Sequence, residues 1–404
     1  MSDLSAAADA APAPPAPQHV LSLPECIDVL AAHPQHPTLL AVCTYMLHAS
    51  GAKTGTIGLL RHASSAPRLA LACPPLATAA VFDGHWGSSS DCADSPLFLA
   101  ATQGPALCLH ALQQQQGQPG GEASLRALGA WRLPCASGGG GEGSALSCAW
   151  LPGSGGSASA RALASLADGR LWVGALAREG SGGGGGGEAV QEACWAAHSL
   201  RGVPMEVWCA QPVAGGCVWS GGDDGLLKGW DARAAPSEAS HAPAFVARGH
   251  GAGVTCIAPR PGSASGGALV ATGSYDGALR LWDSRAMAAP LAALPLGGGV
   301  WRVQWQGSGA SGRLAAACMH GGARVVQAAH PAGEGAATAQ PHVLASYLGH
   351  EAAALTYGVE WLEGAAGGSG DGGGSGDGSG GAQTFALASC AFYSKEVHAW
   401  EVTV

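Results

Sequence analysis

Residues 219–233 read WSGGDDGLLKGWDAR, the pattern of one strand, a tight turn and a second strand. The dipeptide Asp224-Gly225 is a turn signal, because glycine adopts a positive φ without steric cost. The second apolar run ends at Trp230-Asp231. A single stretch of this kind is weak evidence, so its weight depends on whether it recurs.

The pattern recurs in register at residues 271–285, ATGSYDGALRLWDSR. In both copies a histidine precedes the turn aspartate by 26 residues and the tryptophan by 32. A fixed-period unit that ends in Trp-Asp is typical of a β-propeller blade. Because buried polar groups need partners, we interpret the matched side chains as a structural hydrogen-bonded line. These side chains are His198, Ser220, Asp224 and Trp230, and His250, Thr272, Asp276 and Trp282.

Weaker copies of the unit fill the rest of the chain. They lie at 25–60, 78–112, 145–173, 301–326 and 358–402. The total is seven units, which predicts an all-β, seven-bladed WD-repeat β-propeller over residues 18–404. The apolar segment His19–Leu23 is left over, and we expect it to form the outer strand of the last blade. That pairing would close the ring and remove an exposed sheet edge.

Composition limits the remaining possibilities. Glycine accounts for 65 of 404 residues, and tracts at 137–143, 180–187 and 364–381 are interpreted as loop insertions. Residues 1–17 are interpreted as a disordered N-terminus. The formal net charge of −9 argues against nucleic acid as a ligand, since phosphate binding needs basic patches. The 13 cysteines contain no CxxC pair, there is no signal peptide and no long apolar span. These features favour a cytoplasmic protein that does not bind membranes.

Motifs for known chemistry are missing from the sequence. There is no G-x-S-x-G elbow, no P-loop and no dinucleotide fingerprint. The closest histidine pair, His33 and His36, has no third ligand nearby, so we expect neither a metal nor another cofactor.

The units instead deviate from their own repeat at a few positions. His320 stands where the template has its turn aspartate, and Trp301, Arg302 and Trp305 lie within five residues of one another. Several side chains are expected to face one mouth of the central channel, namely Glu206, Trp208, Trp301, His320 and Tyr357. The alternative is that blade edges degenerate and the tryptophans pack between blades.

A family resemblance rests on these segments in order. GGDDGLLKGWD, ATGSYDGALRLWDSR, LAAACMHGG and LASCAFYSKEVHAWE resemble the WD-repeat diphthine methyl ester hydrolases of diphthamide biosynthesis. The resemblance is strong at 193–330 and 345–402 and weak at 60–190. It implies hydrolysis of the methyl ester of a diphthine intermediate on translation elongation factor 2. It therefore implies a protein partner, and we expect a monomer.

The implied chemistry suggests roles for particular residues. His320 is the first candidate base, Arg302 would stabilise an oxyanion, and Cys318 is either a nucleophile or an inert buried thiol. A trimethylammonium group is usually held by aromatic faces with an acid nearby. Candidates for that site are Trp208, Trp301, Tyr357, Glu206 and Glu360, and Asp223 is a candidate surface contact. Two alternatives remain, a non-catalytic scaffold that binds elongation factor 2 and a generic WD-repeat adaptor.

Overall fold

The computed structural model describes most of the chain. The described residues are 14–63, 66–87, 96–114, 123–133, 143–151, 159–177, 189–213, 216–232, 241–262, 269–328, 340–362 and 382–404. The glycine-rich tracts at 180–187 and 364–381 lie outside them, as does the tract at 137–143 except for Gly143. Of the predicted disordered N-terminus, residues 1–13 also lie outside.

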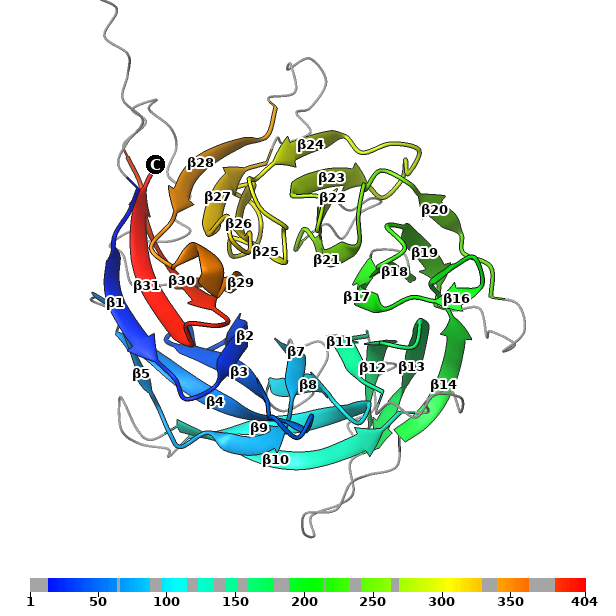
Figure 1. Cartoon of the computed structure of the whole chain (residues 1–404), viewed down its shortest axis with the longest axis horizontal. Helices are drawn as coiled ribbons and strands as arrows, with labels where there is room; N and C mark the ends of the chain where they lie inside the picture. The colour runs from blue at the N-terminus through cyan, green and yellow to red at the C-terminus, as the bar shows by residue number, and fades with distance from the viewer. Residues whose placement is uncertain are drawn as a thin grey trace, which may run out of the picture.

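Seven antiparallel sheets surround a central axis, as Figure 1 shows. The first strand of each blade lies innermost, and each inner strand contacts the inner strands of both neighbouring blades around a closed circle. Among the described residues the one helical element is the 3-10 turn η1 (Ala352–Ala354). The predicted all-β, seven-bladed fold is therefore confirmed. None of the described helical structure is long and apolar enough to span a membrane.

The first four blades follow the chain in order. Blade one contains β2 (Cys26–Ala32), β3 (Leu39–Leu47), β4 (Lys53–Ala63), β5 (Ala66–Leu71) and β6 (Leu76–Ala79), which pairs with β4. Blade two contains β7 (Val81–Trp86), β8 (Leu97–Thr102), β9 (Ala106–Gln114) and β10 (Ala123–Arg132). Blade three contains β11 (Ala145–Trp150), β12 (Ser159–Leu166), β13 (Arg170–Ala177) and β14 (Ala189–Ala196). After the small hairpin of β15 (Ser199–Leu200) and β16 (Val203–Pro204), blade four contains β17 (Val207–Val213), β18 (Cys217–Gly222), β19 (Leu227–Asp231) and β20 (Phe245–Ala247).

The last three blades complete the ring. Blade five contains β21 (Val254–Pro259), β22 (Leu269–Ser274), β23 (Ala278–Asp283) and β24 (Ala292–Pro295). Blade six contains β25 (Arg302–Trp305), β26 (Arg313–Ala317), β27 (Ala323–Gln327) and β28 (His342–Tyr347). Blade seven contains β29 (Thr356–Leu362), β30 (Thr384–Ala391), β31 (Glu396–Thr403) and, as its outer strand, β1 (Pro17–Ser22).

The N-terminal strand closes the ring as the sequence predicted. β1 runs antiparallel to β31, with Ser22 opposite Glu396 and Pro17 opposite Trp400. The start and the end of the chain therefore share one blade. This pairing covers the edge of β31, which would otherwise present unpaired backbone groups.

The core is divided among the blade interfaces. The buried apolar side chains form seven clusters, and each cluster draws on two neighbouring blades. Between blades four and five, for example, Trp219 of β18 packs in one cluster with Val270 and Trp282. Strands such as β8 and β22 are buried along their whole length, which explains their continuous apolar sequences. Each blade thus needs its neighbours to bury its surface.

The matched polar side chains form the buried lines that the sequence predicted. In blade four, Trp230 Nε1 donates to Ser220 Oγ at 2.8 Å, and Ser220 lies 2.7 Å from His198 Nε2. His198 Nδ1 lies 2.8 Å from a carboxylate oxygen of Asp224. Since that oxygen only accepts, Nδ1 carries the proton and Nε2 accepts from the serine hydroxyl. Each side chain of the line therefore has a hydrogen-bond partner, and Lys228 Nζ lies 3.4 Å from the second carboxylate oxygen of Asp224.

Blade five has a line at the same positions, but the proton of its histidine is on the other ring nitrogen. Trp282 Nε1 donates to Thr272 Oγ1 at 2.8 Å, and His250 Nε2 lies 2.9 Å from the same oxygen. Here Arg280 Nη1 donates to His250 Nδ1 at 2.9 Å, while Asp276 is 3.8 Å from that atom. His250 therefore donates from Nε2 to the threonine.

Blade seven corrects one detail of the repeat alignment. An alignment that matches Trp400 to Trp282 without a gap sets Cys390 opposite Thr272, but Ser389 holds that place in the structure. Trp400 Nε1 donates to Ser389 Oγ at 3.1 Å, and His350 Nε2 lies 2.8 Å from it. The serine precedes the tryptophan by 11 residues instead of 10, because this turn is one residue longer.

Candidate functional site

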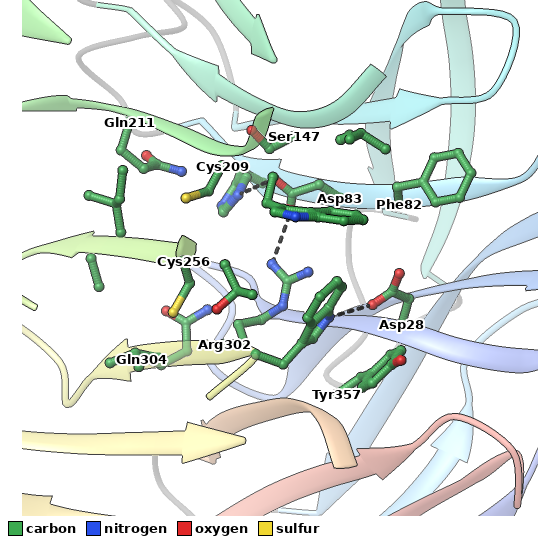
Figure 2. A pocket seen from close by; sticks show the side chains of 18 of the residues that line it. Asp28, Phe82, Asp83, Ser147, Cys209, Gln211, Cys256, Arg302, Gln304 and Tyr357 are labelled. Carbon is green, nitrogen blue, oxygen red and sulfur yellow. Dashed lines mark hydrogen bonds and ion pairs between the residues drawn. The ribbon is translucent and has the colours of Figure 1, made fainter. Parts of the chain in front are cut away.

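A cavity of about 810 Å³ occupies the centre of the ring. It is lined by residues of the inner strands and of the turns beside them (Figure 2). Residues near the start of these strands, such as Phe82 and Trp208, line one mouth, and residues near their ends, such as Gln211 and Pro259, line the opposite end. The seven blades thus contribute different side chains to one shared space.

Three charged or ionisable side chains meet in the middle of this cavity. Arg302 Nη1 donates to Asp83 Oδ1 at 2.7 Å, and His85 Nε2 donates to Asp83 Oδ2 at 3.1 Å. The backbone N–H of Cys148 also donates to Asp83 at 3.2 Å. Figure 2 shows Arg302 reaching from β25 toward Asp83. Asp83 is thereby held by partners from three blades.

The charges of this group are fixed by their surroundings. Burial by itself would raise the pKa of Asp83, but the Coulomb interactions and hydrogen bonds with His85 and Arg302 outweigh it and hold this pKa well below its ordinary value. Burial disfavours the Arg302 charge, yet Asp83 and Asp28 raise the pKa of Arg302 above its usual range. At neutral pH, Asp83 is therefore a carboxylate and Arg302 a guanidinium cation.

Two atoms of this group have no hydrogen-bond partner among the described residues. Arg302 Nε is buried and has no hydrogen-bond partner among the described residues. Since His85 donates from Nε2 to Asp83, its Nδ1 is the acceptor nitrogen in the neutral imidazole. The His85 side chain is 30% exposed, and Trp150 Nε1 fixes its backbone by donating to its carbonyl at 3.1 Å.

An aromatic collar surrounds the mouth at the start of the inner strands. Successive rings contact each other with centroids 4.8 to 6.0 Å apart. The collar consists of Trp208, Tyr275, Trp301, Tyr357, Phe392, Tyr45 and Phe82, which come from blades four, five, six, seven, one and two. Three of the five tyrosines in the chain belong to it.

Carboxylates accompany the two indoles of the collar. Trp301 Nε1 donates to Asp28 Oδ1 at 3.1 Å, and Trp208 Nε1 donates to Asp223 Oδ1 at 3.1 Å. Asp28 is only 2% exposed, whereas Asp223 is exposed. Burial raises the pKa of Asp28 to about 6, although Arg302 and the Trp301 N–H lower it. Glu206 also lines this mouth.

Comparisons with known proteins agree with the repeat pattern and with the resemblance. The family model described as WD domain, G-beta repeat matches residues 243–283. Diphthine methyltransferase of Homo sapiens is 37% identical over 176 residues, which are 42% of this chain and 34% of that protein. The Mus musculus protein of that name is 34% identical over 172 residues, 42% of this chain and 32% of that protein. The chain is similar to the diphthine methyltransferases.

A third relative, the diphthine methyltransferase homolog of Dictyostelium discoideum, is 30% identical over 208 residues, 49% of this chain and 52% of that protein. The matches thus span about a third to a half of the diphthine methyltransferase relatives. The resemblance that the sequence predicted is confirmed. A chain in a crystal structure of a mitotic checkpoint complex aligns over 100% of this chain and 98% of its own, with a TM-score of 0.60 and 14% identity. This likeness concerns the fold alone.

Most of the predicted site residues meet at the cavity. Arg302, Trp301, Trp208, Tyr357 and Glu206 line it. Asp223 adjoins it through its hydrogen bond with Trp208. Glu360 does not line it, because its carboxylate accepts the N–H groups of Ala32 at 3.2 Å and Trp361 at 3.0 Å.

The remaining two predicted residues lie elsewhere. His320 is exposed on the turn between β26 and β27 and does not line the cavity, and its role as a base stays a prediction. Cys318 is fully buried in the cluster between blades five and six, and burial raises the pKa of its thiol to about 12. The two do not share a strand face, because β26 ends at Ala317 and Met319 has a φ of 48°.

Several residues of the site were missed in the sequence. Asp83 and His85 belong to the segment FDGHW and lie two residues apart, so they point to the same face of β7. Asp28 is the one charged residue of the strand CIDVLAA. A search for charged residues on predicted inner strands would have found these three. The collar residues Tyr45, Phe82, Tyr275 and Phe392 carry no such signal, because they meet only through the closure of the ring.

Proposed function

We propose that this chain hydrolyses the methyl ester of diphthine methyl ester on translation elongation factor 2, giving diphthine during diphthamide biosynthesis. The observation that supports this proposal is that one cavity holds both the His85–Asp83–Arg302 group and the aromatic collar. The first is suited to ester chemistry, and the second to a side chain with a quaternary ammonium group. The likeness to diphthine methyltransferases supports a role in the same pathway.

The first step in this proposal is attack by water on the ester carbonyl carbon. His85 Nδ1 accepts a proton from the water, and Asp83 stabilises the imidazolium through the hydrogen bond at Nε2. The carbonyl oxygen becomes an oxyanion, which the N–H at Arg302 Nε can bind. The guanidinium is already oriented by Asp83, so little reorganisation is needed.

The second step is collapse of the tetrahedral intermediate. The acyl–oxygen bond breaks, and the methoxide leaving group takes the proton from His85 and departs as methanol. The products are methanol and the diphthine carboxylic acid, which balance one ester and one water, and the acid then ionises to the carboxylate by releasing one proton to water. These steps use only water and side chains of the chain.

Water is favoured over a side-chain nucleophile at this site. Cys256 and Cys209 line the cavity, but burial raises the pKa of Cys256 to about 12 and that of Cys209 well above its usual value. Both thiols are therefore protonated at neutral pH and are poor nucleophiles. Ser147 lies 2.7 Å from Ser165 Oγ and accepts the N–H of Ala210, so its hydroxyl is engaged on the wall of the cavity.

The test uses the purified chain and elongation factor 2 that carries the methyl ester intermediate. Mass spectrometry should show loss of one CH2 unit from the modified factor, with methanol released in equal amount. The His85→Gln variant should lose this activity, while Asp283→Asn, at a half-buried position of β23 outside the cavity, should retain it. An unchanged mass together with stable binding would favour the non-catalytic scaffold. An unchanged mass without binding would favour an adaptor with another partner.

A further inference from the structure

Asp28 stands out among the acidic residues that the described chain places in the cavity. Its carboxyl group is buried, lies next to the collar and is drawn beside Tyr357 in Figure 2. The Trp301 Nε1–H is the one hydrogen-bond donor that reaches it among the described residues. Its second oxygen therefore has no donor there.

The nearest cation does not form an ion pair with Asp28. Arg302 donates to Asp83 instead, at 2.7 Å, and acts on Asp28 only through the longer-range Coulomb interaction. Asp83 adds a second negative charge nearby. The other ionisable groups that interact with Asp28 are the phenols of Tyr45, Tyr275 and Tyr357 and the thiols of Cys43 and Cys390. None of these phenols and thiols supplies positive charge, and Lys53, which also lines the cavity, lies over the Phe82 ring with its Nζ 5.7 Å from the ring centroid. Among the described residues, no cation therefore contacts the Asp28 carboxylate directly.

The surroundings select the kind of cation that would fit. An ammonium or guanidinium group would need acceptors for several N–H donors, whereas a quaternary ammonium needs only negative charge and polarisable ring faces. Trp301 stacks on Tyr357 with centroids 4.8 Å apart, and its indole is held by Asp28 itself. A carboxylate and two aromatic side chains therefore line one space.

We propose that Asp28, with Trp301 and Tyr357, forms a quaternary ammonium subsite in which Asp28 is the counter-ion that selects a permanently charged ligand. This inference rests on the proposed function in that the trimethylammonium group of diphthine would occupy the subsite. It adds the residue that provides the charge and a dependence of binding on pH. Protonation of Asp28 removes the counter-ion, so ligand binding is expected to weaken as the pH falls through the pKa of about 6.

The test measures binding without any ester. Isothermal titration calorimetry compares choline with 3,3-dimethylbutan-1-ol, a neutral molecule of the same shape. The wild-type chain should bind choline at least about tenfold more tightly than the neutral molecule. Asp28→Asn, in which the amide oxygen still accepts from Trp301, should lose this preference, and its choline affinity should no longer rise between pH 5 and 7. Asp283→Asn is the matched control and should behave as the wild type.

The outcomes separate this inference from the proposed function. Equal affinity for the two probes in the wild type, or unchanged selectivity in Asp28→Asn, would overturn the subsite. If Asp28→Asn does not fold, as judged by circular dichroism, Trp301→Phe replaces it as the test variant. That variant keeps an aromatic ring but removes the N–H that donates to Asp28. Because this hydrogen bond lowers the pKa of Asp28, the pH midpoint for choline binding should rise. An unchanged midpoint would count against the subsite. Choline binding that persists while ester hydrolysis fails would leave the subsite standing and remove only the proposed reaction.

Discussion

Arg302 on β25 and Asp83 on β7 form an ion pair of 2.7 Å between blade six and blade two, which are not neighbours in the ring. The pair therefore crosses the central cavity. It holds the Arg302 guanidinium at a fixed place between inner strands from opposite sides of the ring. Asp83 also accepts the backbone N–H of Cys148 from blade three, so one carboxylate joins three blades at the cavity.

Arg302→Lys should retain the fold and lose most of the activity. Lysine keeps a positive charge for Asp83, but it lacks the Nε–H that the proposed mechanism uses as the oxyanion donor. Loss of one oxyanion donor typically lowers a rate by about 100- to 1,000-fold. Initial rates of methanol release, with circular dichroism as the folding control, measure this. A variant with near wild-type rate would exclude an essential Arg302 donor.

His85→Gln should lower the rate of hydrolysis by about 100- to 10,000-fold, as expected for removal of a general base. His320→Gln serves as the matched comparison, because it changes an exposed histidine that does not line the cavity. We expect His320→Gln to retain activity. If only His320→Gln were inactive, the general base would be His320, on the turn between β26 and β27 of blade six.

Ser220→Ala should destabilise blade four. The change leaves Trp230 Nε1 and His198 Nε2 buried without their shared partner. An unsatisfied buried polar group costs about 1–3 kcal/mol, and urea unfolding monitored by tryptophan fluorescence measures the loss. Ser394→Ala is the control, because the buried Ser394 Oγ has no partner among the described residues. Equal effects of the two changes would argue against the hydrogen-bonded line as a source of stability.

The protein should lose stability as the pH falls below about 6.5. Burial, reinforced by the neighbouring His398, lowers the pKa of His350 from 6.5 to about 3, and burial lowers those of His33, His110 and His250 to about 4. The unfolded chain then binds more protons than the folded one between these values. Each such histidine contributes a slope of up to about 1.4 kcal/mol per pH unit, so the free energy of unfolding falls with pH.

Urea unfolding at a series of pH values between about 7 and 4 checks this slope. His350→Gln removes one of the buried imidazoles and should reduce the slope by up to one proton. A free energy of unfolding that stays flat across this range would show that these histidines titrate normally in the folded state.

Deletion of residues 14–22 together with the preceding segment should open the ring. Without β1 the edge of β31 has no partner, so we expect self-association and a midpoint of thermal unfolding lower by about 5 °C or more. Size-exclusion chromatography with light scattering measures the first effect. A shorter deletion of residues 1–13 leaves β1 in place and is the control. A monomer of unchanged stability after the longer deletion would contradict closure by β1.

The fold could be predicted because the repeated spacing along the chain corresponds directly to the blades of the ring. The His198–Asp224 spacing recurs at His250–Asp276, and each repeat gives one blade, so counting repeats gives the ring. The site could be predicted only in part. Arg302 and the tryptophans stand out by residue type, whereas Asp83 and Asp28 become partners of Arg302 and Trp301 only when distant blades close around one cavity. Pairs separated by more than 200 residues leave no local pattern.

We propose that the ester is cleaved by water at its acyl carbon. The most direct measurement follows the reaction of modified elongation factor 2 in water enriched in the heavy isotope of oxygen. One heavy oxygen atom is expected in the product carboxylate and none in the released methanol. Heavy oxygen in the methanol, or loss of the methyl group without any label in the carboxylate, would contradict this proposal, since either result would mean attack at the methyl carbon or methyl transfer to another acceptor.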